Sequence, residues 1–162
     1  MQIADCILPE RIVCGASTGS KKRGLELLSG LLSEGEEQLS SVVVFESLLA
    51  RERLGGTGVG HGVAIPHGRM KNIDHAVGAF LQLEKGVDFD AIDNRPVDLL
   101  FALIVPEQST GEHLKLLAQL AQMFSDEKLR DALRQAQSCS EIHQLLTQWN
   151  PPPSQGNTAS QG

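Results

Sequence analysis

The sequence contains too few basic residues for a typical nucleic-acid-binding protein. Lysine and arginine number 14 against 20 aspartates and glutamates in 162 residues, which gives a formal net charge of -6 and a calculated pI near 5.3. Because affinity for a phosphate backbone comes mainly from clustered lysine and arginine, this balance argues against a nucleic-acid partner. It does not exclude a local site for a single phosphate.

Cysteines and long apolar runs are also scarce. The three cysteines, Cys6, Cys14 and Cys139, show no paired spacing, so they fit a reducing compartment better than a disulfide framework. We interpret them as small apolar residues. No run approaches the roughly 18 apolar residues that span a bilayer, and the N-terminus, with an early Asp5, lacks the layout of a signal peptide. These absences predict a cytoplasmic protein without membrane insertion.

The common metal and nucleotide signatures are absent as well. The 5 histidines include no H-E-x-x-H pair and no cysteine pair has zinc spacing, so we expect no metal site. The stretch GGTGVGHGVAIPHGR, residues 55–69, suggests phosphate, because bare backbone lets amide N–H groups converge on an anion. It fails G-x-x-x-x-G-K-[ST], since His61 and Gly62 follow Gly60, and it fails G-x-G-x-x-G, since His61 or Val63 stands where a glycine is required. We therefore expect no nucleotide cofactor.

A second glycine motif, GASTG at residues 15–19, matches the G-x-S-x-G nucleophile elbow of serine hydrolases. That elbow normally crowns a sheet that is already formed, whereas few residues precede this one. We interpret it as a turn that leads into the following helix.

Hydrophobic periodicity predicts one layered domain of helices and strands, α/β or α+β, over residues 1–150. The tail NPPPSQGNTASQG has no large apolar residue, so residues 151–162 are predicted to be disordered. Strands are predicted at residues 63–65, 76–84 and 97–106, the last covered on both faces. Helices are predicted at 20–34, 41–54 and 114–124, then after Asp126, and from Ser138 with a capping box to Glu141.

His67 is the best candidate for a reactive group. A neutral imidazole holds a free nitrogen lone pair at cytoplasmic pH and accepts a phosphoryl group without a separate base. Pro66 restricts the backbone beside it. The residues expected to donate to phosphate oxygens belong to the glycine loop: Thr57, Gly58, Gly60 and Gly62. The alternative is that residues 66–68 only make a turn and His67 is a solvated surface residue.

The run RERLGGTGVGHGVAIPHGR resembles the active-site segment of the type-2 enzyme IIA domains of the bacterial sugar phosphotransferase system, the fructose and mannitol class. The runs AVGAFLQLEKGVDFDAIDNRPVDLLFALIVP and GEHLKLLAQLAQMF extend the resemblance, which is strongest to the nitrogen-regulatory members. It covers about residues 3–149. The resemblance implies a three-layer α/β/α sandwich with a small mixed sheet.

The resemblance also implies roles for individual residues. The histidine of the I-P-H-G motif, which is phosphorylated in the family, falls on His67. The family's upstream arginine falls on Arg51 and its second active-site histidine on His113, and both would contact the phosphoryl group or orient the acceptor. His61 departs from the family pattern, which has a small or polar residue there; it is either an extra donor or a bystander.

By this resemblance the protein is a phosphohistidine carrier and regulator in a nitrogen-type phosphotransferase system. It needs no metal or other cofactor, and its donor is a phosphorylated HPr-like protein. Because the chain has no fused IIB or membrane IIC part, we expect its phosphorylation state to control partners such as potassium-transport components or sensor kinases. The alternative is a non-catalytic interaction module with the same fold.

Overall fold

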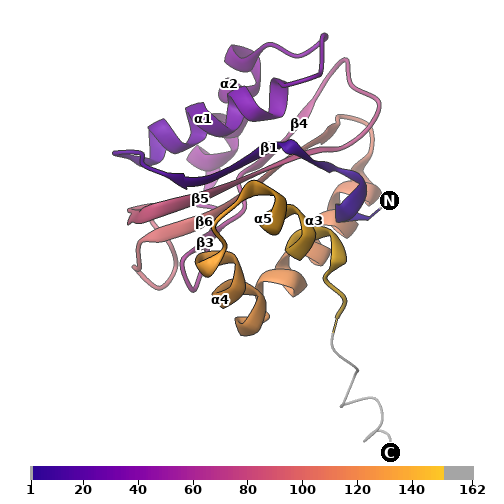
Figure 1. The fold of residues 1–162 in the computed structure, drawn as a ribbon. Helices are drawn as coiled ribbons and strands as arrows, with labels where there is room; N and C mark the ends of the chain where they lie inside the picture. Colours follow the sequence, from indigo (N-terminus) through magenta and orange to yellow (C-terminus); the bar gives the residue numbers. More distant parts are fainter. Residues whose placement is uncertain (1, 152–162) are drawn as a thin grey trace, which may run out of the picture.

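A six-stranded mixed sheet forms the middle layer of the protein in a computed structural model that describes residues 2–151 (Figure 1). Its strand order is β1-β5-β6-β3-β2, and β4 also pairs with β6. The β5–β6 and β2–β3 pairs are antiparallel, whereas β1–β5, β3–β6 and β4–β6 are parallel. The strands are β1 (Ile7–Ala16), β2 (Gly58–Gly60), β3 (Val63–Ala64), β4 (His67–Met70), β5 (Val77–Val87) and β6 (Val97–Pro106).

Helices cover both faces of this sheet, as Figure 1 shows. On one face lie α1 (Lys21–Ser33) and α2 (Ser41–Leu54), and on the other α3 (Thr110–Phe124), α4 (Glu127–Gln135) and α5 (Cys139–Gln148). A 3-10 turn, η1 (Ile3–Asp5), precedes β1. The predicted three-layer α/β/α sandwich is therefore confirmed.

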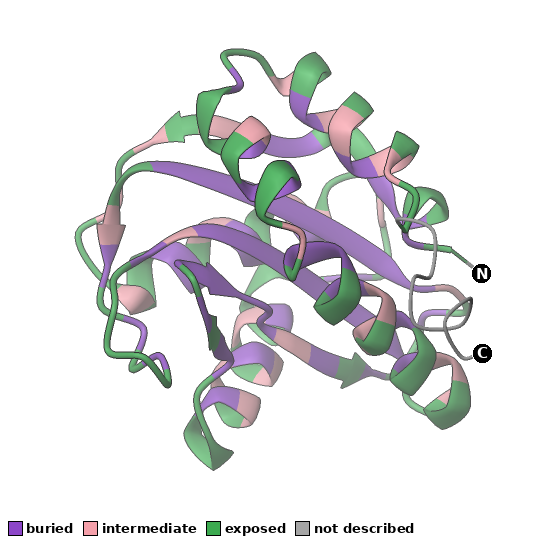
Figure 2. Ribbon diagram, turned by 90° about the horizontal axis from the view of Figure 1, so that it is seen from below, coloured by how far each residue is buried: buried purple, intermediate pink, exposed green. Residues whose placement is uncertain are grey.

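Strand β6 explains why the core has two halves. Side chains alternate across a strand, so Leu99, Phe101 and Leu103 pack with α3, α4 and α5. Leu100 and Ile104 point to the other face and pack with α1 and α2. Figure 2 shows buried strands in the middle of the sheet, with exposed residues on the outer faces of the helices, in the loops and at strand ends. The prediction of a strand covered on both faces is confirmed.

Three helices begin at a residue whose side chain caps the first turn. Ser20 accepts a hydrogen bond from the backbone N–H of Arg23, and Ser138 accepts one from that of Glu141, at 3.2 and 3.1 Å. Asp126 caps α4 through Lys128 and Leu129. These bonds satisfy N–H groups that the first helical turn leaves unpaired.

Strands β1, β2 and β4 were not predicted from the sequence. Strand β1 lies at the edge of the sheet and carries two register shifts, so it shows no regular alternation. The predicted strand 63–65 ends at Ala64, and His67 begins β4 and does not lie in a turn. The GASTG motif ends β1 and leads into α1, as expected of a helix-entry turn.

Two predictions concern the ends and surroundings of the domain. Within residues 2–151, no helix combines the length and apolar character that a membrane span requires. Apart from Pro151, the predicted disordered tail lies outside the described residues.

Candidate functional site

A pocket of about 550 Å³ lies where α2, β4 and α3 meet. Strand β4 runs beside the end of β6, with His67 opposite Leu103, and the chain then continues from β6 into α3. This topology brings His67 and the first turn of α3 together, while α2 approaches from the other layer. The pocket is lined by Ser47, Ala50, Arg51, Leu54, His67, Gly68, Arg69, Thr110, His113, Leu114 and Leu117.

Hydrogen bonds fix both the orientation and the tautomer of the His67 ring. Nδ1 lies 2.8 Å from the carbonyl oxygen of Ile65, which only accepts, so Nδ1 carries the proton. Nε2 lies 3.2 Å from Nε of Arg51, which only donates, so Nε2 presents its lone pair. The ring is thus a neutral imidazole whose available nitrogen faces the pocket.

The surroundings of His67 favour this neutral form. Partial burial lowers the pKa of His67, and the Arg51 guanidinium lowers it further. The hydrogen bond to Ile65 and the carboxylate of Glu52 act in the opposite direction but are outweighed. At neutral pH the Nε2 lone pair is therefore available.

His113 packs edge-on against His67 from the first turn of α3. The two ring centroids are 5.4 Å apart and the ring planes cross at 86°. His113 is buried, and burial is the main cause of its lowered pKa, followed by its closeness to His67, Arg69 and Arg51. The pocket thus pairs two imidazoles that favour the neutral state with two permanently charged guanidinium groups.

Two arginines give the pocket its positive charge. Arg51, in the last turn of α2, donates through Nη1 to the carbonyl oxygen of Gly55 at 2.7 Å, which holds its guanidinium beside His67. Arg69 on β4 donates to Thr110 Oγ1 at 3.4 Å. Guanidinium groups present several N–H donors to an anion and do not lose their charge at neutral pH. The pocket is therefore suited to bind a small anion next to Nε2.

Ser47 and Thr110 belong to this pocket but were not identified from the sequence. Ser47 lies one helical turn before Arg51, and its Oγ donates to the carbonyl oxygen of Arg69 at 3.3 Å. A Cβ on Gly68 would lie 2.5 Å from Ser47 Oγ, so a larger residue there would displace this hydroxyl from its bond to the Arg69 carbonyl. The i, i+4 spacing from Arg51 was the available signal for Ser47.

The expected phosphate donors of the glycine loop lie elsewhere. Thr57 is buried, and both its backbone N–H and its hydroxyl donate to the carboxylate of Glu52, at 2.8 and 2.6 Å. Gly58 lies against Ala91, where a Cβ would come within 2.8 Å of the alanine side chain. Neither residue lines the His67 pocket.

The turn between β2 and β3 accounts for the other loop glycines. Gly60 and Gly62 have φ values of 100° and 78°, which glycine adopts without strain, and His61 between them has a φ of 59°. His61 donates its N–H to Asp93 and its carbonyl oxygen accepts from Arg134. His61, Gly60 and Gly62 are not among the residues that line the His67 pocket. The structure thus brings together Arg51, His67 and His113, but not the glycine loop.

No cluster of candidate metal ligands occurs in the part of the chain that the structure describes. Among residues 2–151, no three histidine, cysteine, aspartate or glutamate side chains gather as a metal ion would require. The polar side chains that line the pocket carry imidazole, guanidinium and hydroxyl groups.

Comparison with known proteins identifies the family. Residues 6–149 match the family model described as phosphoenolpyruvate-dependent sugar phosphotransferase system, EIIA 2. A nitrogen regulatory protein from Pseudomonas aeruginosa is 42% identical over 146 residues, which cover 90% of this chain and 95% of that protein. The crystal structure of nitrogen regulatory protein IIA-Ntr from Neisseria meningitidis is 46% identical with a TM-score of 0.84, and the match covers 90% of this chain and 99% of that chain.

A more distant structure shares the fold. It is the mannitol enzyme IIA from Escherichia coli, solved in complex with phosphorylated mannitol enzyme IIB, with 22% identity and a TM-score of 0.74 over 88% of this chain and 98% of that one. The resemblance of the His67 segment to type-2 enzyme IIA domains is therefore confirmed by sequence and by fold. The chain belongs to the EIIA 2 family of the phosphoenolpyruvate-dependent sugar phosphotransferase system and is similar to its nitrogen regulatory members.

Proposed function

We propose that the protein is a phosphohistidine carrier and regulator. In this proposal His67 accepts a phosphoryl group from a phosphorylated HPr-like protein, and the phosphorylation state then controls partner proteins. The observation that carries the proposal is the His67 ring, held by Ile65 at Nδ1 with Nε2 directed at Arg51 and the pocket. Membership of a phosphotransferase-system family supports the same class of reaction.

In the proposed transfer, the lone pair on His67 Nε2 attacks the phosphorus of the donor's phosphohistidine. A new N–P bond forms as the donor's N–P bond breaks, and the bonding pair returns to the donor ring, which leaves as a neutral imidazole if its other nitrogen is protonated. His67 keeps its Nδ1 proton on the Ile65 carbonyl. Because no proton has to move, the step needs no separate base.

Hydrogen-bond donors around Nε2 would stabilise the transferred group. The Arg51 N–H that now contacts Nε2 would move to a phosphoryl oxygen, and Arg69 and His113 offer further donors from β4 and α3. Charge-assisted hydrogen bonds of this kind hold phosphoryl oxygens in place during transfer. We assign this role to these three side chains, because Thr57 is committed to Glu52.

Apolar side chains next to the pocket support docking of a protein donor. Leu54 at the end of α2 and Leu114 in α3 both line the pocket and are 85% and 64% exposed. A phosphoryl group at His67 would add nearly two negative charges to this face, which weakens or creates contacts with a partner. Proposed targets are potassium-transport components or sensor kinases in the cytoplasm.

Phosphorylation of the purified protein tests the proposal. The protein is incubated with phosphoenolpyruvate, enzyme I and an HPr-like carrier, and its intact mass is measured before and after brief acid treatment. We expect an adduct of one phosphoryl group that acid removes, because phosphohistidine is acid-labile. An unchanged mass under conditions where the HPr-like carrier itself is phosphorylated would favour the non-catalytic interaction module.

A further inference from the structure

Two cysteines that are distant in sequence meet on the face of the sheet opposite α2. Cys14 lies near the end of the edge strand β1, and Cys139 is the first residue of α5. Both pack, partly buried, against the core that β1 shares with α5. This contact is separate from the His67 pocket, which neither cysteine lines.

Contacts of Cys139 place its sulfur directly over β1. Its Sγ donates to the carbonyl oxygen of Ile12 at 3.2 Å, two residues before Cys14 on the same strand. Cys14 packs against the same core as Cys139, and Cys139 lies near enough to contribute to the raised pKa of the Cys14 thiol. A disulfide between these neighbouring side chains would bring the two sulfurs to about 2 Å.

The backbone around Cys14 is irregular, and its contacts hold this part of β1 near the start of α5. Strand β1 has a register shift between Val13 and Ala16, and Gly15 has a φ of 66°. Its N–H donates to the side chain of Gln82 at 2.7 Å, and Gln82 in turn donates to the carbonyl oxygens of Leu133 and Ala136, just before α5. Bulges of this kind re-aim a side chain, and this one is tied to the chain that leads to Cys139.

We propose that Cys14 and Cys139 form a reversible disulfide when the protein meets a thiol oxidant such as hydrogen peroxide, so that this pair is a redox modification site. In the reaction, the Cys139 thiolate attacks peroxide and becomes a sulfenic acid, with release of hydroxide. The Cys14 sulfur then displaces the sulfenic oxygen, which leaves with the two protons as water. Overall, two thiols and one peroxide give one disulfide and two waters.

The order of the two steps follows from the environments of the sulfurs. Cys139 lies in the first turn of α5, where backbone N–H groups favour negative charge. Burial raises the pKa of the Cys14 thiol, and the neighbouring Cys139 raises it further, so Cys14 is better suited to resolve the sulfenic acid than to start the reaction.

Cys6 provides a control within the same chain. It is buried, with 2% of its surface exposed, and burial raises the pKa of its thiol to about 12. Such a thiol has almost no thiolate at neutral pH and reacts slowly with oxidants. Oxidation should therefore spare Cys6 and consume the other two thiols together.

Thiol counting and peptide mapping of the oxidised full-length protein test the proposal. After mild peroxide treatment and unfolding, we expect alkylatable thiols to fall from three to one, with a mass loss of two hydrogens and full recovery in dithiothreitol. Digestion without reductant should yield one linked pair of peptides, containing Cys14 and Cys139. A disulfide that closes so long a segment of chain should also raise the Tm of the oxidised protein.

Variants identify the bond. Cys139→Ser and Cys14→Ser should each abolish the loss of two hydrogens, whereas Cys6→Ala should retain it. Circular dichroism checks that each variant is folded, and the mapping of the natural protein stands even if one is not. Three alkylatable thiols after oxidation, a linked peptide that contains Cys6, or dimers joined between chains would each overturn the proposal.

Discussion

Two histidines close in sequence occupy opposite electrostatic environments. His67 lies beside the Arg51 guanidinium and His113, and burial lowers its pKa. His75 lies between two carboxylates, with Nδ1 2.7 Å from Asp74 and Nε2 3.2 Å from Glu36. Hydrogen bonds to these carboxylates raise the pKa of His75. One ring is therefore built to keep a lone pair and the other to keep a proton.

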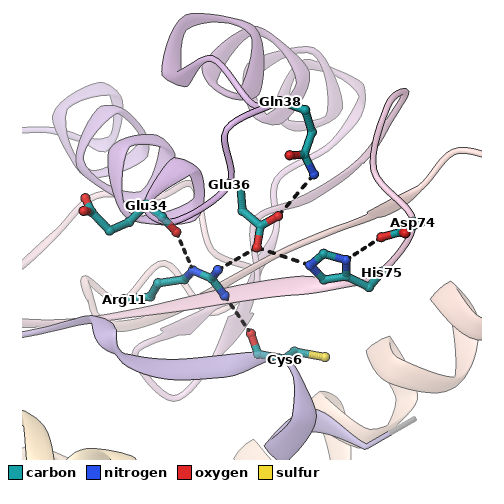
Figure 3. A network of polar contacts seen from close by, with 7 residues as sticks. All are labelled: Cys6, Arg11, Glu34, Glu36, Gln38, Asp74 and His75. Carbon is teal, nitrogen blue, oxygen red and sulfur yellow. Dashed lines mark hydrogen bonds and ion pairs between the residues drawn. The ribbon is translucent and has the colours of Figure 1, made fainter.

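The second environment is a network that spans three segments of the chain, shown in Figure 3. Glu36, in the connection between α1 and α2, accepts from Nη2 of Arg11 on β1 at 2.9 Å as well as from His75. Buried Arg11 also donates to the carbonyl oxygens of Glu34 and Cys6. Because both ring nitrogens of His75 face acceptors, a doubly protonated ring satisfies the network best.

This difference teaches that the same side chain becomes a nucleophile or a structural cation through partners from other elements. Nothing adjacent to His67 in sequence supplies its arginine, which comes from α2, and the carboxylate of Glu36 reaches His75 from the α1–α2 connection. Removing either histidine or one of its partners should therefore change phosphoryl labelling, the pKa values or the stability in measurable ways.

The largest expected effect is complete loss of phosphoryl labelling in His67→Gln. The glutamine keeps a polar side chain but lacks the Nε2 lone pair that forms the N–P bond. The matched control is His75→Gln, which removes the imidazole that is held in its protonated form. This variant should label like the natural protein. Intact mass after reaction with phosphoenolpyruvate, enzyme I and the HPr-like carrier gives the result. Full labelling of His67→Gln would place the acceptor elsewhere.

Removal of the arginine beside His67 should give the next largest effect. We expect Arg51→Gln to slow labelling about 100-fold, the range found when one charge-stabilising donor is deleted from a transfer site. Arg53, also in the last turn of α2 but exposed and outside the pocket, offers the control Arg53→Gln. Single-turnover labelling rates separate the two variants. Equal rates for both would mean that Arg51 does not contact the transferred group.

Nuclear magnetic resonance titration should show the contrast directly, as a smaller effect. The pKa of His67 should lie below the ordinary value near 6.5 and that of His75 above it. Ring carbon-bound proton shifts, assigned with the two glutamine variants, report both midpoints in one experiment. Arg51→Gln should move the His67 midpoint upward and leave that of His75 in place. Midpoints that coincide, or lie in the reverse order, would contradict the comparison.

Most of the layered fold could be predicted from the sequence, because its signals are local. The apolar run of β6 and the caps at Ser20 and Ser138 depend on neighbouring residues alone. Strand β1 could not be predicted, since its pairing with β5 is parallel, lies at the sheet edge and is interrupted by register shifts. Strand β1 forms because it pairs with the distant β5, and its own sequence carries no strand pattern.

The site could be predicted only where residue identity carries the information. His67 was identified from its own motif, Arg51 and His113 were identified through the resemblance, and the structure brings all three to one pocket. The glycine loop was expected to bind phosphate because its amides are bare. The directions of those amides, however, depend on contacts with Asp93 and Arg134, which no local motif encodes.

The smallest effect should be a pH-dependent contribution of His75 to stability. Because its pKa is raised on folding, the contribution is fully present below the unfolded value near 6.5 and is lost as pH rises through the folded value. The side chain is 43% exposed, so solvent screening limits the contribution to about 1 kcal/mol or less. Urea unfolding at a series of pH values should therefore show His75→Gln less stable than the natural protein at acidic pH, with a gap that narrows toward alkaline pH.

Charges that face His75 set the sign of this effect, and a neutral neighbour provides the control. Asp74 and Glu36 favour its protonated form, while Arg11 offsets part of the Glu36 charge from β1. Gln38 also donates to Glu36 but does not titrate. Gln38→Ala should therefore change stability by an amount that does not vary with pH. The stability difference between His75→Gln and the natural protein could instead be constant with pH or widen toward alkaline pH. Either result would show that the ring is not held as a cation and that its pKa does not differ from that of His67 in the expected direction.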